Sequence, residues 1–364
     1  MIRVLAIDDS ALMRRLLREI FEAEEGFEIA FARDGVEGVE MVLASRPDVV
    51  TLDIHMPNMD GLKCLDRIML ERPCPVVMFS SLTDLGARET LEALELGAVD
   101  FVLKPTGAVS LKVGSFGPAL IEKVRIAAKS RPMQSRRLAE RVRLRTGGIE
   151  RRRTPALRAA ATPRPAGPLP ASGEGLVLVG SSTGGPPALD ALLEPLPADF
   201  PWPIVIAQHM PASFTGALAA RLDRNCAIGV VEVSRPVELR PGCAYVGRGD
   251  ADVLVSRRRG GLIALPAPSS AEHRWHPSVE RLVDSAMEVM EPGGLVGVLM
   301  TGMGDDGAAA MTRLHGEGGR TVAEAEETAV VWGMPGELVR HGGAEFIEPL
   351  NRIARRLLSL TTPA

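Results

Sequence analysis

The chain has 364 residues, a net charge of −4, and 46% hydrophobic and 24% charged residues. This composition is ordinary for a folded chain, so a disordered or fibrous protein is excluded. At roughly 100–200 residues per domain, the length predicts about two domains. No apolar run approaches the ~20 residues that cross a bilayer, and Asp8 and Asp9 interrupt the first apolar run. We therefore expect a cytoplasmic protein with neither a signal peptide nor direct membrane insertion.

The four cysteines, Cys64, Cys74, Cys226 and Cys243, lie far apart and form no C-x-x-C pair. This spacing gives little support to a disulfide framework or a zinc site. We interpret the cysteines as reduced, mostly buried thiols.

Residues 131–170 differ in composition from the chain on either side. They contain 11 Arg, six Pro and only two acidic residues, a net charge of +9. Residues 1–130 carry −6 and residues 171–364 carry −7. Few large apolar residues are available for burial, so the segment is typical of a linker between two acidic domains.

We place the first domain at residues 1–125, the linker at 126–174 and the second domain at 175–364. The linker could be an arm that binds nucleic acid or an acidic membrane, or a solvated tether that lies over its own acidic domains. No aromatic residue interleaves the Arg residues. This favours the tether, and we predict no nucleic-acid partner.

Short apolar runs in the first domain each end at a polar side chain. The runs 4–7, 49–52, 76–79 and 101–103 are followed by Asp8, Asp53, Ser80 and Lys104, with amphipathic helical patterns between them. Buried strands that alternate with helices predict a doubly wound parallel sheet. Because ligands bind beyond the carboxyl ends of such strands, we expect these side chains and Asp9 to share one site.

The chemistry of this predicted site points to phosphoryl transfer. Asp8, Asp9 and Asp53 would repel one another without a hard cation, and Mg²⁺ suits carboxylates and a phosphate. Asp53 could attack a phosphoryl donor, while Lys104 and Ser80 contact the transferred oxygens. Strand-end Asp residues can also simply cap the following helices. Five polar groups at strand ends favour the phosphorylation site.

These residues resemble those of the response-regulator receiver family over about residues 1–125. The resemblance is carried by Asp8-Asp9, the run Asp53-Ile54-His55-Met56-Pro57-Asn58-Met59-Asp60-Gly61, Ser80 and Lys104-Pro105. It implies a flavodoxin-like fold with Asp53 as the phosphoacceptor and Asp8, Asp9 and Asp53 as metal ligands. It also implies that Ser80 and Lys104 take part in the switch and that Phe101 is the aromatic residue that reorients with Ser80.

The second domain begins with a strand pattern at 176–179 that runs into Gly180-Ser181-Ser182-Thr183-Gly184-Gly185. Pro186 suits the first turn of a following helix. Read as G-x-S-x-G, this spacing selects Ser182 as a nucleophile near backbone N–H groups that could stabilise an oxyanion. A glycine-rich cradle for a nucleotide phosphate, or a plain turn, remains an alternative at this point.

A nucleophilic serine needs a base and a residue that orients it. His209 follows the strand-like run 203–208, and Asp305 and Asp306 follow the strand-like run 295–300. The order Ser…Asp…His of α/β-hydrolases would instead select His315 or His341. Both of these precede a glycine, which favours a helix-capping role. His273 and His276 could face substrate or lie on the surface.

The second domain resembles the catalytic domain of chemotaxis protein-glutamate methylesterases, the CheB family, over roughly residues 175–360. The motifs are Val179-Gly180-Ser181-Ser182-Thr183-Gly184-Gly185, Ala207-Gln208-His209-Met210-Pro211, Phe214-Thr215, His276-Pro277-Ser278-Val279, Met300-Thr301-Gly302-Met303-Gly304-Asp305-Asp306-Gly307-Ala308 and Gly333-Met334-Pro335. The resemblance implies that Ser182 is the nucleophile, His209 the general base and acid, and Asp306 the orienting carboxylate. It also implies that the Met303 N–H is an oxyanion donor.

Together these patterns predict an α/β protein in which a flavodoxin-like receiver precedes a second doubly wound, hydrolytic domain. We expect phosphorylation-activated hydrolysis of γ-glutamyl methyl esters on the cytoplasmic helices of chemoreceptors, with deamidation of specific glutamines and a chemotaxis histidine kinase as phosphodonor. Mg²⁺ is expected for phosphorylation and no cofactor for ester hydrolysis. The alternatives are a phosphorylation-controlled binding module without turnover, and an esterase for a different methylated signalling protein.

Overall fold

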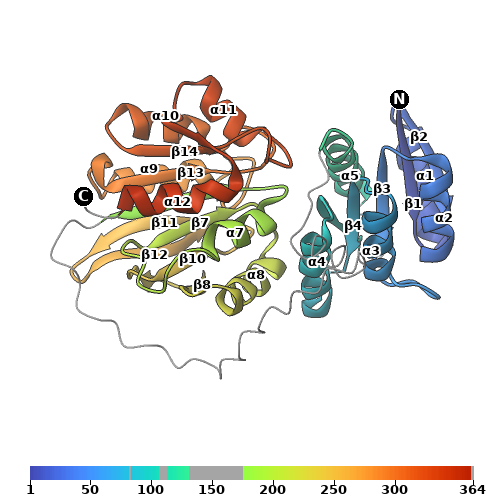
Figure 1. The fold of residues 1–364 in the computed structure, drawn as a ribbon, viewed down its shortest axis with the longest axis horizontal. Helices are drawn as coiled ribbons and strands as arrows, with labels where there is room; N and C mark the ends of the chain where they lie inside the picture. The colour runs from blue at the N-terminus through green and yellow to red at the C-terminus, as the bar shows by residue number, and fades with distance from the viewer. Residues whose placement is uncertain (82, 106–112, 131–174, 362–364) are drawn as a thin grey trace, which may run out of the picture.

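The structure is a computed structural model that describes residues 1–81, 83–105, 113–130 and 175–361 (Figure 1). Apart from residues 126–130, the predicted linker lies outside the described residues. Within the described ranges, no helix combines the length and apolar character needed to cross a membrane. We call residues 1–130 the first domain and residues 175–361 the second domain.

The described part of the first domain is a five-stranded parallel sheet with the strand order β2-β1-β3-β4-β5. The elements in chain order are β1 (Ile2–Ile7), α1 (Ala11–Glu22), β2 (Phe27–Ala32), α2 (Gly35–Ser45), β3 (Val49–Asp53), α3 (Gly61–Glu71), β4 (Val76–Ser80), α4 (Asp84–Leu96), β5 (Asp100–Leu103) and α5 (Val113–Ala127). Helices α1 and α5 pack on one face of the sheet, and α2, α3 and α4 pack on the other. This is the predicted flavodoxin-like order.

Local sequence explains where these elements begin. The Ser10 hydroxyl accepts a hydrogen bond from the Met13 N–H and caps α1, whose buried Leu16, Leu17 and Ile20 recur at helical spacing. The β3 and β4 strands are buried along their whole length, as expected for a parallel sheet covered on both faces. β3 ends at Asp53 and β4 at Ser80, so both strands place a polar side chain at the carboxyl end of the sheet.

The second domain contains a seven-stranded parallel sheet with the strand order β15-β14-β13-β6-β7-β10-β8. Its elements are β6 (Leu176–Ser181), α7 (Gly185–Leu193), β7 (Ile204–Gln208), α8 (Ala212–Asn225), β8 (Gly229–Val233), β9 (Val237–Glu238), β10 (Cys243–Gly247), β11 (Ala251–Arg258), β12 (Gly261–Pro268), α9 (Val279–Met287), the 3-10 helix η1 (Pro292–Gly294), β13 (Leu295–Leu299), α10 (Ala308–Gly316), β14 (Arg320–Glu324), α11 (Met334–Arg340), β15 (Phe346–Glu348) and α12 (Leu350–Thr361). The predicted fold class, two parallel-sheet α/β domains, is confirmed. The antiparallel sheet β11-β12-β9 was not predicted.

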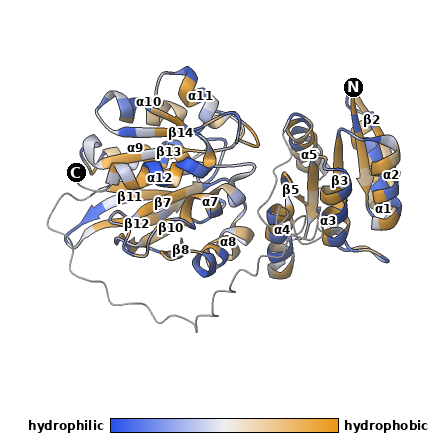
Figure 2. Cartoon of the chain, in the orientation of Figure 1, coloured by the Kyte–Doolittle hydropathy of each residue, from blue (hydrophilic) through white to orange (hydrophobic). Residues whose placement is uncertain are grey.

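Apolar strands lie inside both domains, and polar residues lie on the outer faces of the helices (Figure 2). One buried cluster continues from the first domain into the second, where α4 packs against α7 and α8. At this contact the rings of Phe101 on β5 and Phe214 on α8 have centroids 4.4 Å apart. The Arg221 guanidinium on α8 donates to the Leu91 carbonyl of α4 at 3.0 Å. The two domains are therefore joined by both apolar and polar contacts.

Candidate active site and phosphorylation site

The strand ends of the first domain bring together the predicted carboxylates and lysine. Carboxylate oxygens of Asp8, Asp9 and Asp53 lie within 4.8 Å of one another. Asp8 and Asp53 are buried, whereas Asp9 is exposed. The Lys104 ammonium lies 2.6 Å from Asp53 and 3.2 Å from Asp8. This pairing raises the pKa of Lys104 against the opposing effect of burial.

The donor set fits a divalent cation. Burial raises the pKa of Asp8 above its usual range, and the neighbouring charge of Asp53 adds to this effect while Lys104 opposes it. A small hard cation among the three carboxylates would relieve that electrostatic cost, and oxygen ligands are those that Mg²⁺ takes. Asp8, Asp9 and Asp53 are thus the residues that could hold the ion.

Ser80 ends β4, and Phe101 lies two residues before the end of β5, where both make other contacts. The Ser80 hydroxyl lies 2.6 Å from the Thr90 hydroxyl of α4, which donates to it. The Lys104 N–H donates to the Ser80 carbonyl at 2.8 Å, which links the ends of β4 and β5. Phe101 is buried against Phe214 of the second domain. Phe101 is therefore part of the contact between the two domains.

Ser182 lies in the tight turn between β6 and α7. Gly184 has a φ of +77°, and a Cβ there would come within 2.7 Å of Val330, so a side chain would be both strained and obstructed. The neighbouring Ser181 hydroxyl is buried and donates to Gln208 Oε1 at 2.7 Å. No hydrogen bond of the Ser182 hydroxyl is found in the described ranges of the chain. Ser182, and not Ser181, has a hydroxyl available for chemistry.

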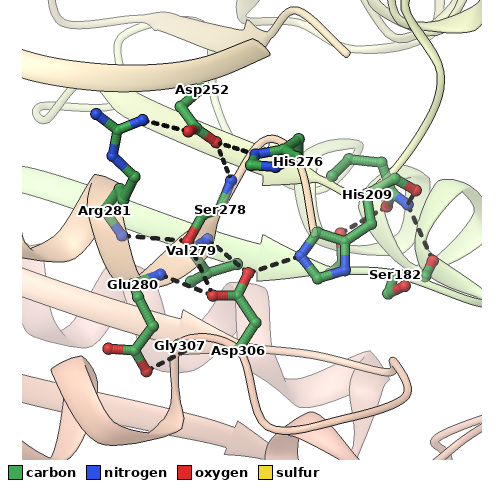
Figure 3. A network of polar contacts seen from close by, with 12 residues as sticks. Ser182, His209, Asp252, His276, Ser278, Val279, Glu280, Arg281, Asp306 and Gly307 are labelled. Atoms are coloured by element: carbon green, nitrogen blue, oxygen red, sulfur yellow. Dashed lines mark hydrogen bonds and ion pairs between the residues drawn. The ribbon is translucent and has the colours of Figure 1, made fainter. Parts of the chain in front are cut away.

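His209 follows β7 and Asp306 lies in the loop after β13, so the two residues come from the strands on either side of β6. His209 Nε2 lies 2.7 Å from Asp306 Oδ2, and the imidazole is 6% exposed. Figure 3 shows the second ring nitrogen on the side of the imidazole that faces Ser182. This Nδ1 atom is buried, and it lacks a hydrogen-bond partner among the described residues. Because Asp306 is ionised and can only accept, Nε2 carries the proton and Nδ1 has a free lone pair.

Asp306 is held by several donors besides His209. It accepts hydrogen bonds from the Ser278 hydroxyl at 3.0 Å, the Val279 N–H at 2.7 Å and the Glu280 N–H at 3.1 Å (Figure 3). Burial works to raise the pKa of Asp306, but these bonds, with that from His209, outweigh it and lower the pKa. Asp306 therefore remains a carboxylate at neutral pH, whereas its neighbour Asp305 is exposed.

The loop that contains Met303 passes close to Ser182. A Cβ on Gly302 would lie 2.8 Å from Ser182 Cβ, so glycine permits this approach. The Ser182 N–H donates to the Thr301 carbonyl at 2.9 Å, which joins the two loops. The Met303 N–H has no hydrogen-bond acceptor within the described ranges. It is therefore a free donor on the loop beside Ser182.

The other histidines make different contacts. His315 lies in the last turn of α10, and His341 caps the C-terminus of α11 4.0 Å from Glu337. His276 Nδ1 lies 2.9 Å from Asp252, a buried carboxylate that also accepts from the Ser278 N–H (Figure 3). For the described residues, no contact joins His315 or His341 to Ser182 or Asp306.

Sequence reasoning missed three neighbours of the site. The Trp275 ring stacks on the His209 imidazole, with centroids 5.7 Å apart and an angle of 13° between planes. The Thr183 hydroxyl donates to Asp100 of the first domain at 2.5 Å. Glu324 accepts from the Thr301 N–H at 2.8 Å, and burial raises its pKa to about 7. Of these three residues, only Trp275 could have been found from the sequence, because it directly precedes the motif His276-Pro277-Ser278.

Comparison with known proteins identifies relatives of both domains. A family model described as CheB methylesterase matches residues 177–357, and one described as response regulator receiver domain matches residues 4–113. A protein-glutamate methylesterase/protein-glutamine glutaminase of Rhodopseudomonas palustris is 57% identical over 98% of both chains. One of Thermotoga maritima is 38% identical over 99% of this chain and 98% of its own. The solved Thermotoga maritima CheB methylesterase catalytic domain is 36% identical, with a TM-score of 0.50, over 52% of this chain and 99% of that one.

Proposed function

This chain belongs to the CheB family of protein-glutamate methylesterases/protein-glutamine glutaminases that carry a receiver domain, and we propose that Ser182, His209 and Asp306 perform its hydrolysis. The substrate is a γ-glutamyl methyl ester or a glutamine of a chemoreceptor, and the product is glutamate. The observation that carries the residue assignment is the His209 imidazole, whose Nε2 is bound to Asp306 while its buried Nδ1 is left without a partner on the side of Ser182.

In the first half of the reaction, the Ser182 hydroxyl attacks the γ-carbonyl carbon of the substrate. His209 Nδ1 takes the hydroxyl proton, and Asp306 stabilises the resulting imidazolium and fixes the orientation of the ring. The oxyanion that forms on the carbonyl is stabilised by the free Met303 N–H. When the tetrahedral intermediate collapses, His209 returns the proton to the leaving group, which departs as methanol from an ester or as ammonia from a glutamine.

In the second half, water hydrolyses the acyl group on Ser182. His209 Nδ1 removes a proton from the water as it attacks, and then protonates the Ser182 oxygen as that bond breaks. The glutamate leaves and Ser182 regains its hydroxyl. Both halves of the reaction use the same imidazole lone pair, so the hydrolysis requires no cofactor.

Phosphorylation takes place in the first domain. We assign Asp53 as the phosphoacceptor, Asp8, Asp9 and Asp53 as ligands of Mg²⁺, and Lys104 as the cation that pairs with the phosphoryl oxygens. Mg²⁺ supplies charge neutralisation between the carboxylates and the phosphodonor. A chemotaxis histidine kinase is the proposed donor. Because the kinase and the methylated receptor segments lie inside the cell, we place the protein in the cytoplasm.

The contact between the domains supports a model of control. In the resting state, Asp100 and Phe101 of the first domain contact Thr183 and Phe214 of the second, next to the Ser182 turn. A phosphoryl group on Asp53 would draw Lys104 and Ser80 toward it and reorient Phe101, which loosens this contact. Phosphorylation then increases access to Ser182.

The assignment is tested by methanol release from methyl-labelled receptor membranes with the full chain. Ser182→Ala and His209→Gln each abolish most turnover if the proposed roles are correct. Ser181→Ala is the matched control, because the Ser181 hydroxyl is bonded to Gln208, and it loses far less activity. Turnover that survives in Ser182→Ala would contradict the assignment.

A further inference from the structure

A row of three stacked side chains leads from the active site to the first domain. The Trp275 ring stacks on the His209 imidazole at 5.7 Å, and the Arg274 guanidinium lies 4.7 Å above the Trp275 ring. The same guanidinium donates to the Glu122 carboxylate of α5 at 2.8 Å. Arg274 therefore stands between the catalytic imidazole and a carboxylate of the first domain.

Two properties suit Arg274 to carboxylate binding at the edge of the active site. Its side chain is 67% exposed, and its cation–π contact with Trp275 orients the planar guanidinium. Arginine remains charged at all relevant pH values and matches carboxylate geometry with paired N–H donors. In the resting protein this position is filled by Glu122, which belongs to the domain that must move.

The substrate supplies carboxylates of the same chemistry. Each turnover converts an ester or amide into glutamate, so a substrate with several modified positions gains carboxylates as it is processed. The two stacking distances place the Arg274 guanidinium within about 10 Å of the imidazole, close to two turns of an α-helix at a pitch of about 5.4 Å. A glutamate one or two turns from the scissile ester can therefore reach Arg274.

We propose that Arg274 is a specificity-determining residue that binds a substrate carboxylate one or two helical turns from the scissile group, and that Glu122 occupies this position in the resting protein as a mimic of that carboxylate. The proposal rests on the proposed function, because it needs the ester to be cleaved at Ser182. It predicts that release of the first domain exposes Arg274 to the substrate at the same moment as Ser182.

The test uses the full chain with Mg²⁺ and a small phosphodonor. Its substrates are helical peptides with one γ-glutamyl methyl ester and either Glu or Gln one and two turns away. Wild type should have a kcat/KM about two- to fivefold higher for the Glu-flanked peptide, mainly through KM, as expected for a partly screened charge pair. Arg274→Gln should remove this preference, and Arg274→Lys should restore only part of it.

Two further variants separate substrate binding from the contact between domains. Glu122→Gln breaks the ion pair but leaves Arg274 intact, so resting turnover should rise while the preference for acidic flanks remains. The charge swap Glu122→Arg with Arg274→Glu restores an ion pair and should lower resting turnover again, but it should reverse the preference. A charge swap or an Arg274→Gln variant that keeps the wild-type preference would overturn the proposal.

Failure of the proposed function has a different signature. If Ser182 is not the nucleophile, Ser182→Ala cleaves both peptides. If only the assignment of Arg274 is wrong, Ser182→Ala is inactive while wild type and Arg274→Gln treat the two peptides alike or share the same preference.

Discussion

The Thr183 hydroxyl donates to the Asp100 carboxylate across the domain boundary at 2.5 Å, and Thr183 directly follows Ser182. Asp100 is buried and also accepts from the Lys123 ammonium at 2.6 Å and from the Phe101 N–H at 2.7 Å. Asp100, which directly precedes Phe101, thus links the first domain to the turn that carries the proposed nucleophile. This relationship gives the proposed phosphorylation site a short route to the proposed active site.

Removal of this bond should weaken the resting contact between the domains. Thr183→Val keeps the shape of the side chain but cannot donate to Asp100, and a hydrogen bond to a charged group contributes about 1.5–3 kcal/mol. Methanol release without phosphodonor should rise roughly tenfold and approach the rate of the phosphorylated protein. Thr312→Val is the matched control, since its hydroxyl donates to Ala308 within α10, and it should leave the resting rate unchanged. An unchanged resting rate in Thr183→Val would argue against the contact as a restraint.

Asp306→Asn should lower turnover by roughly 10²–10⁴-fold. The amide can donate toward His209 Nε2, which would place the ring proton on Nδ1 and remove the lone pair that faces Ser182. Asp305→Asn is the control, because Asp305 is exposed and makes no side-chain contact with His209 among the described residues. Steady-state methanol release measures both variants. Equal losses of turnover in Asp305→Asn and Asp306→Asn would refute the choice of Asp306. Loss of turnover in His341→Gln with full activity in His209→Gln would support the Ser…Asp…His order of α/β-hydrolases.

Glu324 should make the stability of the chain depend on pH. Burial raises its pKa from the usual 4.5 to about 7, so the folded state favours the protonated carboxyl. Its contribution to stability is fully present below pH 4.5 and decreases as the pH rises toward 7, by on the order of 3 kcal/mol. Glu324→Gln should remove this part of the slope. The urea midpoints of unfolding of wild type and Glu324→Gln, measured at about three to four pH values between pH 5 and pH 8, test this. Parallel plots of midpoint against pH for the two proteins would contradict the prediction.

Asp9→Asn should weaken Mg²⁺ binding by about tenfold or more, because it removes one of three carboxylates that lie within 4.8 Å of one another. Asp9 is exposed, so the fold should persist. Isothermal titration with Mg²⁺ measures the affinity, and phosphorylation by a small phosphodonor should stop when EDTA removes the ion and resume when Mg²⁺ is restored. Wild-type affinity in Asp9→Asn would exclude this residue from the metal site.

Both parallel sheets and the strand-end positions of the site could be predicted from sequence because each signal is local. Asp53 and His209 each follow a short apolar run, and the parallel arrangement brings the ends of such runs to one edge. The β11–β12 hairpin was missed, although Gly260-Gly261 between two apolar runs was an available signal.

The contacts that join the domains could not be predicted in this way. Thr183 and Asp100 are 83 positions apart and belong to separate sheets, so no periodicity relates them. The stacking of Trp275 on His209 likewise joins the segment before α9 to the residue that follows β7. Such pairs are fixed by tertiary packing, between the domains for Thr183 and Asp100 and within the second domain for Trp275 and His209, and local patterns do not encode it.

We propose that phosphorylation at Asp53 releases a serine hydrolase centred on Ser182. This proposal is tested most directly by the initial rate of methanol release from methylated receptor membranes by the full chain with Mg²⁺, before and after a small phosphodonor is added. We expect a clear rise for wild type, no rise for Asp53→Asn and no turnover in either state for Ser182→Ala. An equal rise in Asp53→Asn, or turnover that persists in Ser182→Ala, would contradict it.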